Sequence, residues 1–156
     1  MTRMVNDTLT SQAVVVHYGW MRVDGSESTM KSDRVCVEAN GMVEVADESI
    51  AGCAELSPRE WIYVAYAIQD DTVLWSSTWL LLPHRELAIP EPDIRVSVRG
   101  KTVRLVSETY CHGVHYQDDG RAVFSDNYFD LLPGVPKIIT CQTPELPEPI
   151  PFRCVS

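Results

Sequence analysis

Apolar side chains recur at every second position over much of this chain, a spacing that favours β-strands over helices. Residues 14–20 place Val, Val, Tyr and Trp at alternate positions, and Asp24-Gly25, a favoured tight-turn pair, follows them. The expected strands lie at residues 14–20, 35–39, 42–45, 60–68, 73–82, 94–98, 103–109 and 137–142, with shorter pieces near 114, 124 and 152–155. Short strands separated by turn signals predict a β-sandwich.

Two local signals refine this pattern. The Asn40-Gly41 pair predicts a turn, and we expect residues 42–45 to form the far side of a hairpin with residues 35–39. Residues 49–60 hold the one candidate helix, because Ser57-Pro58-Arg59-Glu60 is typical of a helix start. β-Branched and aromatic residues follow that start immediately.

A proline-rich segment at residues 83–92 predicts a domain boundary. Pro83, Pro90 and Pro92 favour extended backbone and cannot donate hydrogen bonds to a sheet. We therefore predict an all-β fold of two tandem immunoglobulin-like β-sandwiches, at residues 1–89 and 90–156. The second sandwich is small, and we expect it to lean on a neighbour because a domain of that size buries only about 60% of its unfolded surface.

The formal net charge of −9, from 13 basic and 22 acidic residues, limits the classes of partner. Such a charge repels nucleic acid and anionic membrane surfaces, so we expect neither as a partner. A neutral glycan would be indifferent to it. The longest dense apolar run, at residues 79–82, ends at Pro83 and is far shorter than the roughly 18 residues of a membrane span.

The five cysteines are widely spaced and form no close pair of the kind that a zinc ribbon requires. They are Cys36, Cys53, Cys111, Cys141 and Cys154. We interpret them mostly as buried free thiols of a reducing compartment. A bridge between Cys141 and Cys154, across neighbouring C-terminal strands, is the one disulfide that the spacing leaves open.

The loop at Asp126, Asn127, Tyr128 and Asp130 is the one candidate binding site. Its carboxylate and amide oxygens are ligands that calcium accepts. The same residue types also cap turns through hydrogen bonds between side chain and backbone. We favour the turn-capping role, with calcium and direct contact to a sugar as the alternatives, and we expect no catalytic, cofactor or metal site.

Aromatic and histidine side chains raise two further hypotheses. Aromatic faces suit the apolar faces of sugars, and the candidates are Trp61, Trp75, Trp79, Tyr128 and Phe129. In a sandwich such residues are more often core, and the shared parity of the tryptophans at 75 and 79 is consistent with one face turned inward. The histidines at 112 and 115 would point to opposite faces of a strand unless the glycine at 113 forms a bulge, so we expect no metal pair.

Three stretches of the chain carry a family resemblance. The first joins residues 5–8 to residues 23–25, the second spans residues 81–92, and the third and most specific spans residues 124–134. Together they resemble the C-terminal region of β-mannosidase-like enzymes of glycoside hydrolase family 2. The chain departs from the family at Arg85, where a lysine is usual, and at Val135, where an acidic residue is usual.

The resemblance implies the penultimate and C-terminal sandwiches of a retaining glycosidase that hydrolyses terminal β-linked mannose. The family's catalytic glutamates lie on a (β/α)₈ barrel of about 250 residues, which this chain is too short to contain. We therefore expect a non-catalytic scaffold whose partner is the catalytic barrel of its own parent enzyme. An independent carbohydrate-binding module and the tail of an exo-β-glucosaminidase are the alternatives.

Two further expectations follow from this resemblance, and a third follows from the residues at the N-terminus. A face that the parent enzyme covers would be exposed in the isolated chain and would cause weak homo-oligomerisation. No signal-peptide pattern follows Met1, so we expect a cytoplasmic protein. The resemblance also implies that the native N-terminus is missing.

Overall fold

The computed structural model describes residues 1–46, 55–70, 72–117, 122–146 and 150–155. These residues form β-strands and one short 3₁₀ helix and contain no α-helix, which confirms the all-β prediction. The elements are β1 (Thr2–Asn6), β2 (Gln12–Arg22), β3 (Lys31–Val37), β4 (Gly41–Ala46), β5 (Trp61–Gln69), β6 (Thr72–Leu80), η2 (His84–Glu86), β7 (Arg95–Arg99), β8 (Thr102–Val106), β9 (Cys111–Tyr116), β10 (Phe129–Leu131), β11 (Lys137–Thr140) and β12 (Phe152–Arg153). No helix among them is long and apolar enough to cross a membrane.

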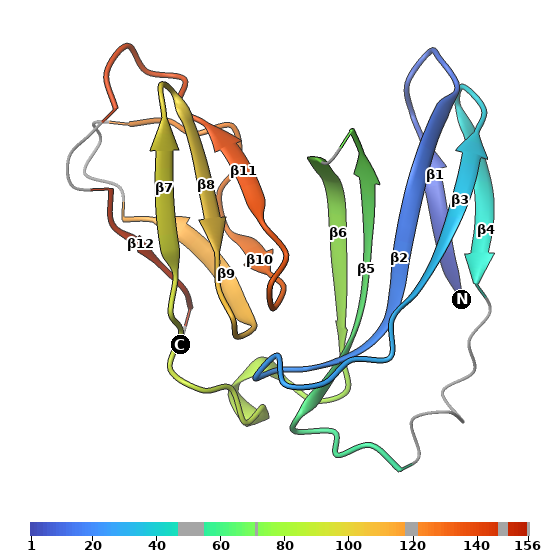
Figure 1. Cartoon of the computed structure of the whole chain (residues 1–156), viewed down its shortest axis with the longest axis horizontal. Helices are drawn as coiled ribbons and strands as arrows, with labels where there is room; N and C mark the ends of the chain where they lie inside the picture. Colours follow the sequence, from blue (N-terminus) through green and yellow to red (C-terminus); the bar gives the residue numbers. More distant parts are fainter. Residues whose placement is uncertain (47–54, 71, 118–121, 147–149, 156) are drawn as a thin grey trace.

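The first sandwich packs a four-stranded antiparallel sheet, in the order β3-β2-β5-β6, against the two-stranded sheet β1-β4 (Figure 1). Because side chains alternate between the faces of a strand, Val14 and Val16 of β2 and Ala67 of β5 share one face. Met4 of β1 and Val45 of β4 pack against that face and bury it.

The second sandwich packs the sheet β11-β8-β7 against the sheet β10-β9-β12 (Figure 1). Its core lies between the two sheets and is formed by Val103 and Leu105 of β8, Val114 of β9, Leu131 of β10 and Ile139 of β11. Each of these side chains is almost completely buried.

The pairing of β4 differs from the predicted hairpin. The turn at Asn40 forms, with φ +50°, but β4 pairs antiparallel with β1 and lies in a different sheet from β3. The buried amide of Asn6 explains the change, because its Nδ2 donates to the carbonyl oxygens of Val37 and Glu38 at 3.0 Å. Those bonds tie the end of β1 to the end of β3 and direct the chain into the second layer.

The candidate helix at residues 49–60 lies partly outside the described residues, since 49–54 are not among them. Residues 55–60 form turns and no helix. The carbonyl oxygen of Ser57 accepts hydrogen bonds from the backbone N–H groups of Glu60 and Trp61. A single turn therefore stands where a helix start was predicted, because the β-branched and aromatic residues of β5 take over at once.

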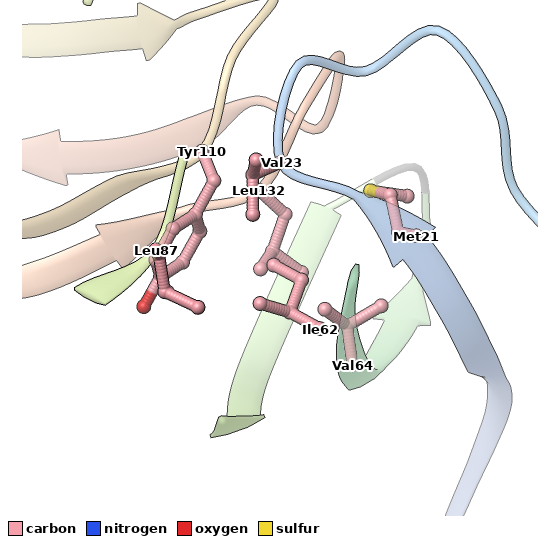
Figure 2. Packing of buried hydrophobic residues seen from close by; sticks show 7 residues of the cluster. All are labelled: Met21, Val23, Ile62, Val64, Leu87, Tyr110 and Leu132. Carbon is pink, nitrogen blue, oxygen red and sulfur yellow. The ribbon is translucent and has the colours of Figure 1, made fainter. Parts of the chain in front are cut away.

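The two sandwiches share a hydrophobic cluster, which we call the junction core. It consists of Met21, Val23, Ile62, Val64, Leu87, Tyr110 and Leu132 (Figure 2). Ile62 and Val64 lie on the face of the four-stranded sheet that β1 and β4 do not cover. Leu87 comes from the connecting segment, and Tyr110 and Leu132 belong to the second sandwich. The backbone N–H of Tyr110 also donates to the carbonyl oxygen of Val23 at 2.8 Å.

The Asp24-Gly25 turn forms as predicted and lies directly against the second sandwich. Gly25 has φ +74°, and a Cβ at that position would collide with the carbonyl oxygen of Glu108 and come within 3.1 Å of Pro133. The turn thus needs glycine both for its backbone conformation and for the close approach of the two sandwiches. The predicted boundary between residues 89 and 90 stays a prediction.

The junction core predicts a large cost for truncating Leu132. The side chain is 2% exposed, so Leu132→Ala should lower the free energy of unfolding by about 2–5 kcal/mol through lost burial and a residual cavity. Leu9→Ala is the matched control, because Leu9 is 86% exposed and its loss should change stability by no more than about 0.5 kcal/mol. Urea unfolding measures both, and equal effects would contradict the packing described.

Two glycines separate the cost of backbone strain from the cost of the collision. Gly100 has φ +59° with nothing within 4 Å of a new Cβ, so Gly100→Ala should cost about 1–2 kcal/mol of unfolding free energy from strain alone. Gly25→Ala should cost about 1–3 kcal/mol more, because the fixed backbone of Glu108 lies in the way. Thermal denaturation of both variants measures these losses of stability. Equal losses for the two variants would contradict the close approach of Gly25 to Glu108.

Candidate functional site

In the predicted loop, the side chains of Asp126 and Asn127 bind neighbouring groups of the protein itself. Asn127 Oδ1 accepts a hydrogen bond from the backbone N–H of Tyr116 at 3.0 Å, and Asp126 Oδ1 accepts one from the N–H of Asn127 at 2.9 Å. The other carboxylate oxygen of Asp126 forms an ion pair with Lys137. These contacts hold the loop against β9 and β11, and both the turn-capping role and a role in binding a ligand stay predictions.

Tyr128 and Asp130 point into different surroundings. Tyr128 is exposed, has φ +59°, and stacks on the ring of His115 with centroids 4.9 Å apart. Asp130 lies on β10 and accepts three hydrogen bonds, from Tyr110 Oη at 2.7 Å, His112 Nδ1 at 2.9 Å and the backbone N–H of Gly113 at 3.1 Å. Asp126, Asn127 and Tyr128 therefore lie in a surface turn, whereas Asp130 lies next to Tyr110 of the junction core.

A β-bulge in β9 explains why Asp130 can reach those donors. Phe129 pairs with Val114, yet Leu131 pairs with Cys111, so β9 holds one extra residue. Gly113 supplies it in a left-handed conformation, with φ +57°. The extra residue turns the freed N–H of Gly113 toward the carboxylate of Asp130.

The same bulge corrects the expectation for the histidines. Cys111 and Val114 both face the core, so His112 and His115 both lie on the outer face of β9 and not on opposite faces. They nevertheless have different partners, because His115 contacts Tyr128 and Nδ1 of His112 contacts Asp130. Among the described residues no group of three His, Cys, Asp or Glu side chains is placed to hold a metal ion.

A pocket of about 300 Å³, which we call the junction pocket, opens where η2 meets β9, beside the hydrogen bonds of Asp130. His84 of η2 and His112 contribute rings whose centroids lie 4.6 Å apart, and Leu87, Tyr110 and Cys111 form apolar walls. The histidine contact is a second link between the connecting segment and the second sandwich. In the part of the chain that the structure describes, the pocket lining also includes Arg85 and one acidic side chain, Glu91, and so holds no pair of acids.

Burial favours the uncharged forms of Tyr110, His84 and Cys111. Burial, then the charge of Asp130 and its hydrogen bond, raise the pKa of Tyr110 far above its ordinary value. Burial and the neighbouring His112 lower the pKa of His84, while Asp130 opposes them. Burial raises the pKa of the Cys111 thiol, which makes it a poor nucleophile at neutral pH.

The cysteines do not form the disulfide that the spacing left open. Cys141 and Cys154 are both free, and Sγ of Cys141 lies 3.0 Å from Oγ1 of Thr143. Cys111 and Cys141 are buried as predicted, whereas Cys36 is exposed. Cys53 lies outside the described residues.

The aromatic candidates separate into two classes. Trp61 and Phe129 are buried and cannot present a face to a ligand. Trp75 and Trp79 share the face of the sheet on which β1 and β4 pack, as their parity indicated, but they are 41% and 47% exposed and are not buried as core residues are. The reason is that β6 is the edge strand of its sheet, beside β5 only.

Comparison with known proteins identifies the family to which this architecture belongs. The model of the mannosidase Ig/CBM-like domain matches residues 3–86, which is more than half of the chain, and an Ig-fold domain model matches residues 89–151. The chain belongs to the mannosidase Ig/CBM-like domain family. The family resemblance and the two immunoglobulin-like sandwiches predicted from the sequence are thereby confirmed.

A solved structure supports the same fold. The chain is similar to the crystal structure of a β-D-mannosidase from Dictyoglomus thermophilum, with a TM-score of 0.82 at 15% sequence identity. The match covers 97% of this chain and 20% of the β-D-mannosidase. This chain therefore spans about a fifth of the length of that enzyme. No curated protein matches the chain.

The hydrogen bond from Tyr110 to Asp130 predicts a specific dependence of stability on pH. The unfolded phenol ionises near pH 10, whereas the pKa of folded Tyr110 is raised, so its contribution is complete below about pH 10 and is lost as the pH rises further. Tyr110→Phe should be less stable than the parent at pH 7, by roughly 1.5–3 kcal/mol for a bond to a charged acceptor. Above pH 10 that gap should narrow. Urea unfolding at pH 7, 9 and 10.5 measures it, and a gap that stays constant would contradict the assignment.

Proposed function

We propose that this chain is a non-catalytic accessory region of a β-mannosidase-type glycoside hydrolase. The observation that carries the proposal is that 97% of the chain, both sandwiches together, matches one fifth of the length of a β-mannosidase. The junction core gives a physical reason for that arrangement, because it joins the sandwiches into one block that can pack against a larger neighbour. The partner that we propose is the catalytic barrel of the same polypeptide.

The chemistry of the pocket supports a structural role. A retaining glycosidase needs two carboxyl groups about 5–5.5 Å apart. Among the described residues that line the junction pocket, Glu91 is the one acidic side chain, and the nearby Asp130 already accepts three hydrogen bonds. Hydrolysis of terminal β-linked mannose would then belong to the parent enzyme, with an exo-β-glucosaminidase as the alternative parent.

An antibody raised against this chain tests the proposal. In an extract of the source organism it should detect a polypeptide several times larger than 17.5 kDa, and the immunoprecipitate should release p-nitrophenol from p-nitrophenyl β-mannoside. The purified chain should release none. A band at 17.5 kDa alone, or hydrolysis by the purified chain, would overturn the proposal. Release from a β-glucosaminide but not from the β-mannoside would identify the alternative parent.

A further inference from the structure

We propose that Trp75 and Trp79 form a binding platform for a neutral oligosaccharide. This inference goes beyond the accessory role and does not rest on it, because the platform lies entirely within the first sandwich. The site is built on β6, at the free edge of the four-stranded sheet. No part of the junction pocket or of the loop at residues 126–130 contributes to it.

The register of the sheet places both indoles on one face. Trp79 pairs with Tyr63, and Tyr63 in turn pairs with Trp20, so these three rings lie side by side across β6, β5 and β2. Trp75 pairs with Ala67 on the same face, four residues along the strand. Four residues of strand span about 13 Å, so the two indoles are too far apart for one pyranose ring and suit a chain of several.

The Trp79 end of the platform is held in place before any ligand binds. The buried ring of Trp20 lies 6.4 Å from that of Trp79 and meets Tyr63 edge-on at 5.4 Å. The hydroxyl of Tyr63 is in turn hydrogen-bonded to Thr2 Oγ1 at 3.0 Å. An aromatic surface that is already ordered loses little conformational entropy on binding, which favours affinity.

The composition of β6 indicates the chemistry of the ligand. Residues 72–80 contain no charged side chain, although 22% of the whole chain is charged. Ser77 is exposed on the same face as the two indoles and can exchange hydrogen bonds with sugar hydroxyls. The net charge of −9 disfavours an anionic ligand. Planar apolar faces flanked by hydroxyl groups are what a neutral pyranose chain complements.

The position of the platform at the rim of the sandwich explains why it is open. The side chains of β1 and β4 pack over β2 and β5, whereas the tryptophans of β6 remain 41% and 47% exposed.

Isothermal titration of the 156-residue chain tests the platform, with β-1,4-mannohexaose, cellohexaose and chitohexaose as probes and mannose as the short reference. We expect at least one hexasaccharide to bind with millimolar or better affinity, and mannose to bind at least tenfold more weakly. Trp75→Ala should weaken hexasaccharide binding by about tenfold, the upper range for one aromatic contact. Trp75→Phe keeps a flat ring and should retain part of the affinity.

Val98→Ala is the matched control, because Val98 is an apolar residue of β7 that is 46% exposed on the other sandwich, about as exposed as Trp79. It should bind the hexasaccharides as the parent does. Circular dichroism confirms that each variant is folded. The proposal is overturned if no hexasaccharide binds, if Trp75→Ala and Trp79→Ala both bind within twofold of the parent, or if Val98→Ala abolishes binding.

A protein surface is the competing occupant of this face. Sedimentation of the parent and of the Trp75→Ala/Trp79→Ala double variant identifies it. The sugar platform would be overturned if the parent self-associates, the double variant does not, and no sugar binding is detected by titration. The face would then be a protein-docking surface. Silent titrations leave the accessory role of the chain intact, since that role is decided by the size and activity of the parent polypeptide.

Discussion

The burial of one face of the four-stranded sheet by the second sandwich is the interaction on which the rest of the structure depends. One face of that sheet is covered by β1 and β4, and Ile62 and Val64 on the other face would meet water without Tyr110 and Leu132. Fully burying an aliphatic or aromatic side chain contributes about 1.5–3 kcal/mol. The junction core therefore adds to the stability that the small second sandwich gains from its own core.

A hydrogen-bond network adds direction to this apolar contact. Tyr110 reaches from the junction core to Asp130, and Asp130 also holds His112 and the bulged Gly113. His112 then meets His84 of the connecting segment. Apolar burial is not directional, so these polar contacts, with the Gly25 turn against Glu108, specify how one sandwich is oriented on the other.

Local patterns predicted much of this fold, because strands and turns are encoded by neighbouring residues. The alternation in residues 14–20 and the Asp24-Gly25 turn lie where the sequence indicated. The pairing of β4 with β1 was missed, since it is decided by the amide of Asn6, more than thirty residues from Val37. The contacts of Asp130 were missed for the same reason, because a bulge at Gly113 changes which side chains face one another. The exposure of Trp75 depended on the order of the strands, which alternation does not specify.

The central claim is that the two sandwiches fold as one unit through the junction core. Differential scanning calorimetry of the whole chain tests it most directly. One cooperative transition, with equal calorimetric and van't Hoff enthalpies, is the predicted result, because neither sandwich can keep its structure once the shared cluster opens. Two resolved transitions, or a calorimetric enthalpy well above the van't Hoff value, would contradict it.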